Sequence, residues 1–393
     1  MLWWIAFFNY ADRQAVFSVF PLLEKELHLS PLQLGLIGSS FAWVYGVAAP
    51  FAGNVVDRIR RKSAILGGLH AWSAICMATA LSRNLGTLLA FRAAEGLGET
   101  FYFPASVSLL SDYHDPATRS RALGFHQTSV YTGTIAGGFF AGLIAQVYGW
   151  RASFVVFGGL GIALGVALNR WLIEPPRMAP APRMPFTRFA ALVWRNPTAR
   201  LLMGAFLCAN FVATVLLSWM PKFLFDKFHF SLAAAGLTAT VYVQLASMAG
   251  SPIGGWLADT LGRRTASGRI AVQAAGVLCG APFVAVCGLT NSTAWLAVAL
   301  TCWGLFKGLY DANIFASLFD VIRPEARGTA AGFMNMVGWA GGGTAPLAIG
   351  FLSEHRSLSF VIAATAGVYL AAAGLLIAAM LGHQPGLNGS SHK

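Results

Sequence analysis

The chain has 393 residues, of which 56% are hydrophobic and only 11% are charged. Soluble globular proteins average about 25% charged residues, so this chain has too few charges to cover a water-soluble body of its size. The composition excludes a disordered chain, a secreted disulfide scaffold and an ordinary cytosolic enzyme, and it indicates a polytopic membrane protein. The net charge of +12 would suggest nucleic acid in a soluble protein. In a membrane protein, the same positive charge is informative through its position, that is, through which loops hold the Lys and Arg residues.

Twelve runs of the chain are long and apolar enough to be spans, since a membrane-spanning helix needs about 20 mostly apolar residues. Their ranges are 2–20, 32–54, 63–82, 86–111, 122–147, 152–172, 199–223, 232–256, 268–289, 293–319, 329–352 and 358–381. The first run has no Lys- or Arg-rich start and carries Asp12 and Arg13, so we expect a mature span rather than a signal peptide. The sequence therefore predicts an all-α membrane protein.

The positions of the basic residues predict the topology of these spans. If both termini are cytoplasmic, 18 of the 27 Lys and Arg residues lie in the cytoplasmic loops and tail, and six lie in the outer loops. The other three, Arg13, Arg92 and Lys307, lie within spans. A bias of this size over short loops predicts that both termini lie in the cytoplasm. We expect a multi-pass protein of the plasma membrane, such as a bacterial inner membrane.

A proline-rich connection divides the spans into two sets of six. Residues 1–172 are expected to form an N-terminal bundle, 173–198 a cytoplasmic linker, 199–381 a C-terminal bundle and 382–393 a cytoplasmic tail. Within the linker, Phe186 to Trp194 is predicted to form a short helix on the membrane surface.

The two halves repeat each other. Gly53, Asp57 and Arg61 follow the second span, and Gly255, Asp259 and Arg263 follow the eighth span at a constant offset of 202 residues. A second repeated pattern has a constant offset of 208 residues. It matches Pro116, Arg119, Gly124 and Phe125 with Pro324, Arg327, Gly332 and Phe333. Two parallel repeats of six spans predict a pseudo-two-fold axis along the membrane normal and a binding site near the midplane.

The string from Gly53 to Lys62 resembles the G-x-x-x-D-R-x-G-R-K signature of the major facilitator superfamily of secondary transporters, with Arg60 at the place of the usual Gly. Three further strings narrow the resemblance: Asn9–Arg13 (NYADR), Arg92–Glu99 (RAAEGLGE) and Gly149–Phe154 (GWRASF). Together they are similar to the anion:cation symporter branch, whose members import sugar acids and other organic anions with protons. The spinster lysolipid and sphingolipid transporters share the first two strings. The resemblance implies twelve helices in two pseudo-symmetric bundles and alternating access by a rocker switch.

Charged residues within spans are the first candidates for function, because each costs about 2.5–3.5 kcal/mol at a helix centre on insertion scales. They must therefore face each other or a hydrated cavity. The charged residues at such depths are Asp12, Arg13, Arg92, Glu95, Glu99, Lys307 and Asp311.

Arg92, Glu95 and Glu99 lie on one face of the fourth span because their spacing is i, i+3, i+7. The resembled fold puts the first span beside the fourth, where Asp12 and Arg13 would meet this face. We expect Asp12 and Glu99 to take up protons, and the resemblance implies the same role. It also implies an anion-binding or gating role for Arg13 and Arg92. The alternative is a static salt-bridge network that fastens the two spans together.

Lys307 aligns with Glu99 at the 208 offset and is expected to contact the substrate anion from the second half. The alternative is that Lys307 pairs with Asp311 one helical turn away. Further polar residues within spans are expected to line the cavity, although each one alone can equally cross-link helices. These are Tyr10, Tyr102, Asn210, Gln244, Asn313 and Asn335.

The doubled motif after spans 2 and 8 is expected to act as a cytoplasmic gate, with Asp57 accepting hydrogen bonds from the N-terminus of a facing span. Its residues are Gly53, Asp57, Arg58, Arg61, Lys62, Asp259, Arg263 and Arg264. The glycines of spans 5 and 11 are expected to permit close helix approach. They are Gly133, Gly137, Gly138, Gly142, Gly341, Gly342 and Gly343.

The sequence thus predicts a proton-coupled transporter of a small organic anion, with a spinster-like carrier of lysophospholipid or sphingoid lipid as the alternative. No metalloprotease, nucleophile-elbow or phosphate-loop motif indicates an enzyme. The doubled gating motif favours a carrier over a channel. The five cysteines (Cys76, Cys208, Cys279, Cys287 and Cys302) form no C-x-x-C pair and favour neither a disulfide framework nor a zinc site. The expected partners are the substrate, protons and the lipid bilayer, with no nucleic acid, metal or cofactor, and we expect a monomer.

Overall fold

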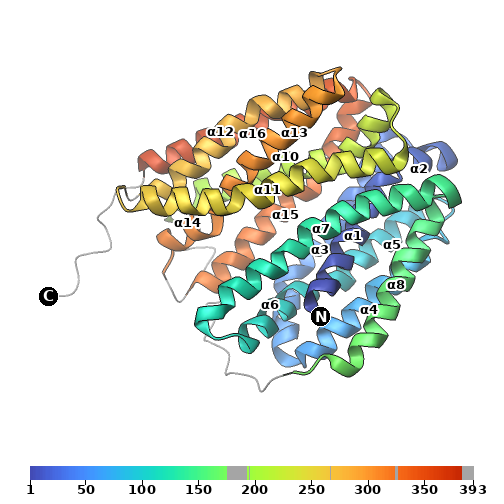
Figure 1. Ribbon diagram of the computed structural model, residues 1–393, viewed down its shortest axis with the longest axis horizontal. Coiled ribbons are helices and arrows are strands. Elements are labelled where there is room, and N and C mark those ends of the chain that lie inside the picture. The colour runs from blue at the N-terminus through green and yellow to red at the C-terminus, as the bar shows by residue number, and fades with distance from the viewer. Residues whose placement is uncertain (175–192, 194, 266, 324–325, 383–393) are drawn as a thin grey trace. The chain divides into compact units, whose positions relative to one another are not determined.

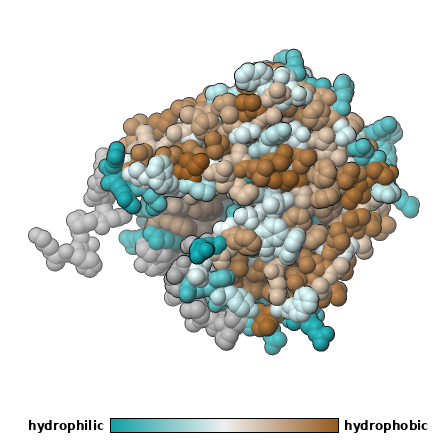
Figure 2. Space-filling model, in the orientation of Figure 1, coloured by the Kyte–Doolittle hydropathy of each residue, from teal (hydrophilic) through white to brown (hydrophobic). Residues whose placement is uncertain are grey.

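The computed structural model describes residues 1–174, 193, 195–265, 267–323 and 326–382, apart from the side chains of residues 50, 53, 54, 57, 116, 117, 120 and 328. Every regular element in these residues is a helix (Figure 1). Of the linker helix expected at Phe186 to Trp194, only Val193 falls among the described residues. Figure 2 shows hydrophobic residues over much of the visible surface, as expected of helices that face lipid.

The helices follow the twelve predicted spans closely. In the first half they are α1 (Leu2–Ser18), α2 (Phe20–Leu27), α3 (Pro31–Arg58), α4 (Arg61–Thr79), α5 (Leu85–Glu99), α6 (Tyr102–Tyr113), α7 (Pro116–Tyr148) and α8 (Trp150–Trp171). In the second half they are α10 (Pro197–Phe228), α11 (Leu232–Gly262), α12 (Gly268–Leu289), α13 (Thr293–Asp311), α14 (Ile314–Val321), α15 (Arg327–Ser353) and α16 (Leu358–Gly382). Seven of the described helices are each long and apolar enough to cross a membrane by themselves.

Two spans that the sequence predicts as single helices are each divided in two. In the fourth span, α5 ends at Glu99 and α6 begins at Tyr102. Pro104 lies in the first turn of α6 and has no N–H to continue the hydrogen-bond ladder across the break. In the tenth span, the side chain of Asn313 donates to the carbonyl oxygen of Leu309 at 3.0 Å, and α14 begins after it. The predictions of continuous helices over 86–111 and 293–319 were therefore wrong at these points.

Three helices extend beyond their predicted ends. α3 continues to Arg58 and α11 to Gly262, so most of the doubled motif is helical rather than loop. α10 runs through Pro221 to Phe228, beyond the predicted end of the span at residue 223. Charged side chains at the ends of a span shorten the apolar run but do not end the helix, since Arg and Lys are good helix formers.

The described helices belong to two compact units. Unit 1 contains Met1–Ala181, Ala213–Gln244 and Gly342–Ile362, and unit 2 contains Pro182–Val212, Leu245–Gly341 and Ala363–Lys393. Within unit 1, α1 packs along α7, α3 along α5 and α4 along α8, while α12 packs along α13 in unit 2. Unit 1 thus combines the first six spans with one end each of α10, α11, α15 and α16.

Glycines set the distance between several of these helices, as predicted. A Cβ on Gly137 would lie 2.3 Å from the carbonyl oxygen of Ala11, so α7 and α1 are in backbone contact. A Cβ on Gly236 would lie 1.9 Å from the carbonyl oxygen of Gly138, where α11 crosses α7 within unit 1. In unit 2, a Cβ on Gly341 would lie 2.2 Å from the carbonyl oxygen of Leu207. Small residues at such crossings let helix backbones approach closely.

One end of unit 1 carries α2 and the turn at Gly149 between α7 and α8, and we call it the outer end because the charge bias predicts that it faces outward. Here Lys222 of α10 forms ion pairs with Glu24 of α2 and with Asp226. Gln14 of α1 donates to the carbonyl oxygen of Leu217 at 2.9 Å. These contacts tie the ends of second-half helices to the first half within one compact unit.

Candidate functional site

The charged residues of α1 and α5 form one cluster in unit 1. Arg13 Nε donates to Glu99 Oε2 at 2.5 Å, and Arg92 Nη1 donates to Glu95 Oε2 at 2.5 Å. The prediction that the first span meets the charged face of the fourth is therefore confirmed. The helical spacing of α5 places its three charged residues on one side, and the backbone contact of α1 with α7 holds α1 in place against that side.

The cluster is almost entirely removed from solvent. Asp12, Glu95 and Glu99 have no exposed surface, and Arg92 is 1% exposed. The side chain of Arg13 keeps 11% of its surface exposed. Buried charges of this kind are retained only when they are paired, hydrogen-bonded or neutralised. Arg13 is thus the member of the cluster that is most accessible to a ligand.

Aromatic rings hold both guanidinium groups in place. The Arg13 guanidinium lies 4.7 Å from the centroids of the Tyr10 and Tyr45 rings and 5.1 Å from that of Phe41. The Arg92 guanidinium lies 4.8 Å from the centroid of the same Phe41 ring. Cation–π contacts strengthen in desolvated surroundings. The predicted site residue Tyr10 therefore belongs to the cluster, and the sequence analysis missed Phe41 and Tyr45.

Asp12 differs from the other two carboxylates. Neither of its oxygens has a hydrogen-bond partner among the described residues. A carboxylate oxygen of Asp12, one of Glu95 and Sγ of Cys76 on α4 lie within 4.8 Å of one another. The sequence analysis gave Cys76 no role at this site, because nothing in the spacing connects it to Asp12 and Glu95. These three side chains are the group in the described residues whose geometry could hold a cation.

Lys307 forms an ion pair with Asp311 one turn away on α13, as the alternative interpretation of this residue proposed. The repeat places α5 and α13 at equivalent positions, since Asn84 and Ser292 cap them and each accepts a hydrogen bond from the backbone N–H three residues later. The 208 offset aligns Glu99 with Lys307. However, α5 ends at Glu99, whereas α13 ends at Asp311, one turn after Lys307. Relative to the helix break, the counterpart of Glu99 is therefore Asp311.

Three of the polar residues predicted to line a cavity instead cross-link helices or bond within their own helix. The Tyr102 hydroxyl donates to the carbonyl oxygen of Leu2 at 2.8 Å and lies 2.9 Å from Nε2 of His126. Asn313 donates to the carbonyl oxygens of Gly254 and Leu309, both at 3.0 Å. Asn210 donates to the carbonyl oxygen of Phe206 at 2.9 Å within its own helix. These side chains donate to backbone carbonyls, as the alternative interpretation allowed, and their role in lining a cavity stays a prediction. Gln244 is buried near the middle of α11.

The first copy of the doubled motif centres on Arg61 at the start of α4. Its guanidinium bonds to Asp112 of α6 and to Glu174, with Nε lying 3.2 Å from Glu174 Oε1. Glu174 also accepts hydrogen bonds from the backbone N–H groups of Arg61, at 2.9 Å, and Lys62, at 3.3 Å. Burial raises the pKa of Glu174, but these hydrogen bonds and the Arg61 charge outweigh it, so the pKa lies below its ordinary value. Glu174 is thus a cap on α4.

The other predicted gating residues are placed as follows. Gly53 and Asp57 lie near the end of α3, where the structure describes only the backbone of these two residues. Arg58, Arg263 and Arg264 are exposed, and Lys62 donates to the carbonyl oxygen of Asn169 at 2.6 Å. Asp259 pairs with Arg269 at 3.5 Å, and Arg269 also bonds to Asp320 at 2.9 Å. The sequence analysis missed Asp112, Glu174, Arg269 and Asp320, because these pairs join distant segments.

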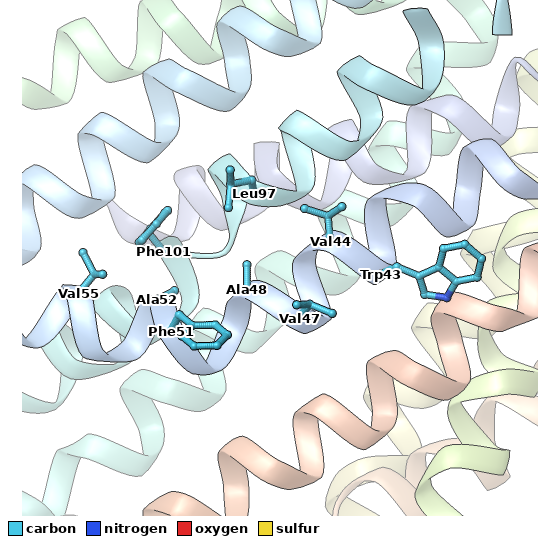
Figure 3. Close-up of a pocket in the computed structure, with 9 residues that line it drawn as sticks. All are labelled: Trp43, Val44, Val47, Ala48, Phe51, Ala52, Val55, Leu97 and Phe101. Carbon is cyan, nitrogen blue, oxygen red and sulfur yellow. The ribbon is translucent and has the colours of Figure 1, made fainter. Parts of the chain in front are cut away.

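An apolar pocket of about 550 Å³ lies on the surface of unit 1 between α3 and the break of the fourth span (Figure 3). One face of α3, including Val47, Phe51 and Val55, forms most of its wall, and Leu97 and Phe101 close it from the side. The spacing of four residues puts the α3 members on one stripe. This pocket offers no charged group, so it suits an apolar ligand rather than an anion.

Comparisons with known proteins agree with this architecture. The chain is 28% identical over 371 residues to "Sodium-dependent phosphate transport protein 1, chloroplastic" of Arabidopsis thaliana, covering 88% of this chain and 72% of that protein. It is 25% identical over 390 residues to the "Hexuronate transporter" of Bacillus subtilis (strain 168), covering 95% and 90%. It is also 25% identical over 416 residues to "Probable L-galactonate transporter" of Escherichia coli (strain K12), covering 98% and 88%.

Among solved structures, a bacterial homologue of the human lysosomal transporter Spinster, crystallised in an inward-facing and occupied conformation, superposes with a TM-score of 0.80. The match covers 97% of this chain and 94% of the other at 21% sequence identity, which supports the fold. The Major Facilitator Superfamily matches residues 2–266 and 222–391, that is, nearly the whole chain. The chain is therefore a multi-pass membrane transporter that belongs to the Major Facilitator Superfamily.

Proposed function

We propose that the chain is a proton-coupled symporter of a small organic anion of the sugar-acid class. The observation that carries this proposal is the buried cluster of α1 and α5, in which Arg13, whose side chain is 11% exposed, is bound to the fully buried carboxylate of Glu99. A carboxylate substrate that binds Arg13 competes with Glu99 for the same positive charge. Protonation of Glu99 removes that competitor, so proton uptake and anion binding favour each other.

The roles within the cluster follow from this competition. Glu99 takes up the proton together with Asp12, which faces Glu95 without a hydrogen-bond partner among the described residues. Arg13 binds the substrate anion, and Arg92 forms an ion pair with Glu95. Lys307 supplies a second positive charge for the anion when it leaves Asp311. Relatives that are named as transporters of hexuronate, galactarate or D-glucarate, and L-galactonate support an anionic sugar as the substrate.

Alternating access by a rocker switch accounts for the contacts at the outer end. Lys222 with Glu24, and Gln14 with the carbonyl oxygen of Leu217, join second-half and first-half helices there. A rocking motion that opens the outer end would break these few polar contacts and the glycine crossing of α7 with α11. The Arg61–Glu174–Asp112 group is proposed to stabilise the cytoplasmic end, with both termini in the cytoplasm of a plasma membrane and the protein acting as a monomer.

Transport in liposomes tests the coupling. Wild-type protein is expected to accumulate D-glucuronate or L-galactonate in response to an inward pH gradient. Glu99→Gln is expected to lose this accumulation while keeping exchange of substrate across the membrane, because Arg13 stays available to the anion. Glu26→Gln, at an exposed acid outside the cluster, is the matched control and is expected to accumulate substrate like the wild type. Gradient-driven accumulation by Glu99→Gln at the wild-type level contradicts the proposal.

A lysophospholipid or sphingoid lipid is the second candidate substrate, and the apolar pocket on α3 favours it. An acyl chain fits an uncharged groove lined by Val47, Phe51 and Val55. Thermal shifts of the purified protein with sugar acids and with lysolipids separate the two candidates. A lysolipid substrate predicts a shift that Phe51→Ala reduces, whereas a sugar-acid substrate predicts a shift that Arg13→Gln abolishes and Phe51→Ala leaves unchanged.

A further inference from the structure

We propose that a basic pocket at the predicted cytoplasmic end of unit 1 binds the phosphate headgroup of an anionic phospholipid from the adjacent leaflet. The pocket lies where the end of α3, the start of α4 and the end of α8 meet. Its basic residues are Arg58, Arg60, Lys62 and Arg170. The inference goes beyond the proposed transport function and involves neither the substrate nor the buried cluster of α1 and α5.

The basic residues of the pocket are available to a ligand. The pocket has a volume of about 560 Å³. Arg58, Arg60 and Arg170 are exposed, and no described hydrogen bond or ion pair engages their side chains. A guanidinium group can bind a phosphate through two parallel hydrogen bonds. Three such groups in one pocket are therefore suited to a phosphate rather than to a cation or a neutral ligand.

The acidic groups near the pocket do not balance these positive charges. Glu174 is the one acid among the described lining residues, and it accepts hydrogen bonds from the backbone of Arg61 and Lys62. Arg61 is itself paired with both Glu174 and Asp112. The lining carries an excess of three positive charges, and two remain if the nearby Asp57 is counted from the sequence. A pocket lined by one sign of charge concentrates ions of the opposite sign.

Contacts already present hold the two sides of the pocket together. Lys62 Nζ donates to the carbonyl oxygen of Asn169, immediately before Arg170, at 2.6 Å. Glu174, which follows Arg170 in the chain, is bound to the N-terminus of α4. The segment that carries Arg170 is therefore fixed on both sides of this residue against the start of α4. A site whose charges are positioned before the ligand arrives loses less free energy on binding.

Apolar residues of the same pocket indicate a lipid rather than a free phosphate. Ile59, Leu172 and Ile173 line it beside the basic residues, and Ile173 is 71% exposed. The preceding Trp171 is 62% exposed, and tryptophan is enriched where a membrane meets water. A phospholipid would place its phosphate among the basic groups and its glycerol and first acyl carbons against the isoleucines. Basic pockets between helices on the cytoplasmic side of a membrane bind headgroups in this way.

Microscale thermophoresis of the full-length protein in a neutral detergent measures the binding. Dioctanoyl phosphatidylglycerol is the probe, and dioctanoyl phosphatidylcholine is its control, with the same chains and no net charge. The wild type is expected to bind phosphatidylglycerol saturably and at least about tenfold more tightly than phosphatidylcholine, since one hydrogen bond between charged groups is sufficient for that ratio. Equal affinity for the two lipids overturns the inference.

Arg60→Gln/Arg170→Gln tests the basic residues, because neither arginine belongs to the predicted gate. This double variant is expected to bind phosphatidylglycerol at least about tenfold more weakly than the wild type. Arg263→Gln/Arg264→Gln removes two exposed charges after α11 and is the matched control, expected to bind like the wild type. Wild-type affinity in the first variant, or an equal loss in the control, overturns the inference. If the first variant does not elute as a folded monodisperse protein, Arg60→Gln alone supplies the same readout.

Inorganic phosphate and Ile173→Ser distinguish a lipid from a soluble anion. A lipid site predicts that millimolar phosphate leaves phosphatidylglycerol bound, whereas Ile173→Ser weakens the binding about fourfold, as for the lost burial of one methylene group. Displacement by phosphate, or full binding by Ile173→Ser, overturns the lipid assignment. Glu99→Gln is expected to bind phosphatidylglycerol like the wild type, so this site can hold while the proposed proton coupling fails, and the reverse.

Discussion

At the scale of single residues, the cluster shows how burial changes the contribution of an ion pair to the stability of the fold. Arg13 with Glu99 and Arg151 with Glu26 are both arginine–glutamate pairs, but Glu99 is fully buried, whereas the Arg151 and Glu26 side chains are 39% and 47% exposed. An exposed pair is screened by solvent and contributes about 0–1 kcal/mol. Removing one partner of a buried pair leaves a charge without compensation.

Arg13→Gln is therefore expected to lower the free energy of unfolding by about 3–5 kcal/mol, and the double variant Arg13→Gln/Glu99→Gln is expected to recover much of that loss. Denaturant unfolding in detergent measures both. Arg151→Gln serves as the control and is expected to cost about 1 kcal/mol or less. Equal losses in the single and double variants would contradict an interaction between Arg13 and Glu99.

Glu174 makes stability depend on pH at the cytoplasmic end. Because its pKa is lowered in the folded state, its contribution is present above the ordinary pKa of about 4.3 and is lost as the pH falls through the lowered value. Glu174→Gln is expected to cost about 0.5–2 kcal/mol at pH 7, as for a lost helix cap, and to differ less from the wild type as the pH falls below about 4. Thermal unfolding at both pH values checks this, with exposed Glu354→Gln as the control.

At the scale of helices, two kinds of glycine can be told apart. Gly236 lies where α11 crosses α7, and a Cβ there would overlap the backbone of Gly138. Gly159 in α8 has open space around its missing Cβ. A backbone carbonyl cannot rotate away as a flexible side chain can, so the first position has no room for a methyl group.

Gly236→Ala is accordingly expected to destabilise the protein by about 1–3 kcal/mol. Gly159→Ala is expected to have the opposite sign, with a gain of up to about 1 kcal/mol from helix propensity. Both are measured by thermal unfolding of the protein in one detergent. A Gly236→Ala variant at least as stable as the wild type would show that the crossing of α7 with α11 is looser than the structure describes.

The sequence predicts the position of a helix well where the length of the apolar run determines it. One example is α12, which occupies the predicted residues 268–289. The breaks after Glu99 and Asp311 could not, because they depend on Pro104 and Asn313 removing or capturing single hydrogen bonds within apolar runs. The pairing of Arg13 with Glu99 was predictable from helical spacing and the resembled helix order. The proximity of Asp12 to Glu95 and the pairing of Arg61 with Glu174 were not predictable, since only the packed backbone determines which side chains of distant segments meet.

At the scale of the whole molecule, few polar contacts among the described residues join second-half helix ends to the first half at the outer end. Lys222 is the most connected of them, since its ammonium group bonds to both Glu24 and Asp226 and its side chain is only 8% exposed. Hydrogen bonds to charged groups contribute about 1.5–3 kcal/mol each. Loss of this amount changes the population of an open form by about tenfold or more.

Lys222→Gln is thus expected to increase opening at the outer end by at least about tenfold. A cysteine at Leu217, beside the Gln14 contact, reports opening through its rate of labelling by a membrane-impermeant maleimide. Lys25→Gln removes a neighbouring exposed lysine and is expected to leave the labelling rate unchanged. An unchanged rate in Lys222→Gln would assign the closure to apolar and glycine contacts instead.

The capping of α4 by Glu174 has a mechanical consequence for the connection between the two halves. Glu174 fixes the start of this connection at the N-terminus of α4, and the described chain continues at Val193, shortly before α10. A pull on residue 174 therefore acts on the N-terminus of α4 through these hydrogen bonds, and not on the end of α8 alone.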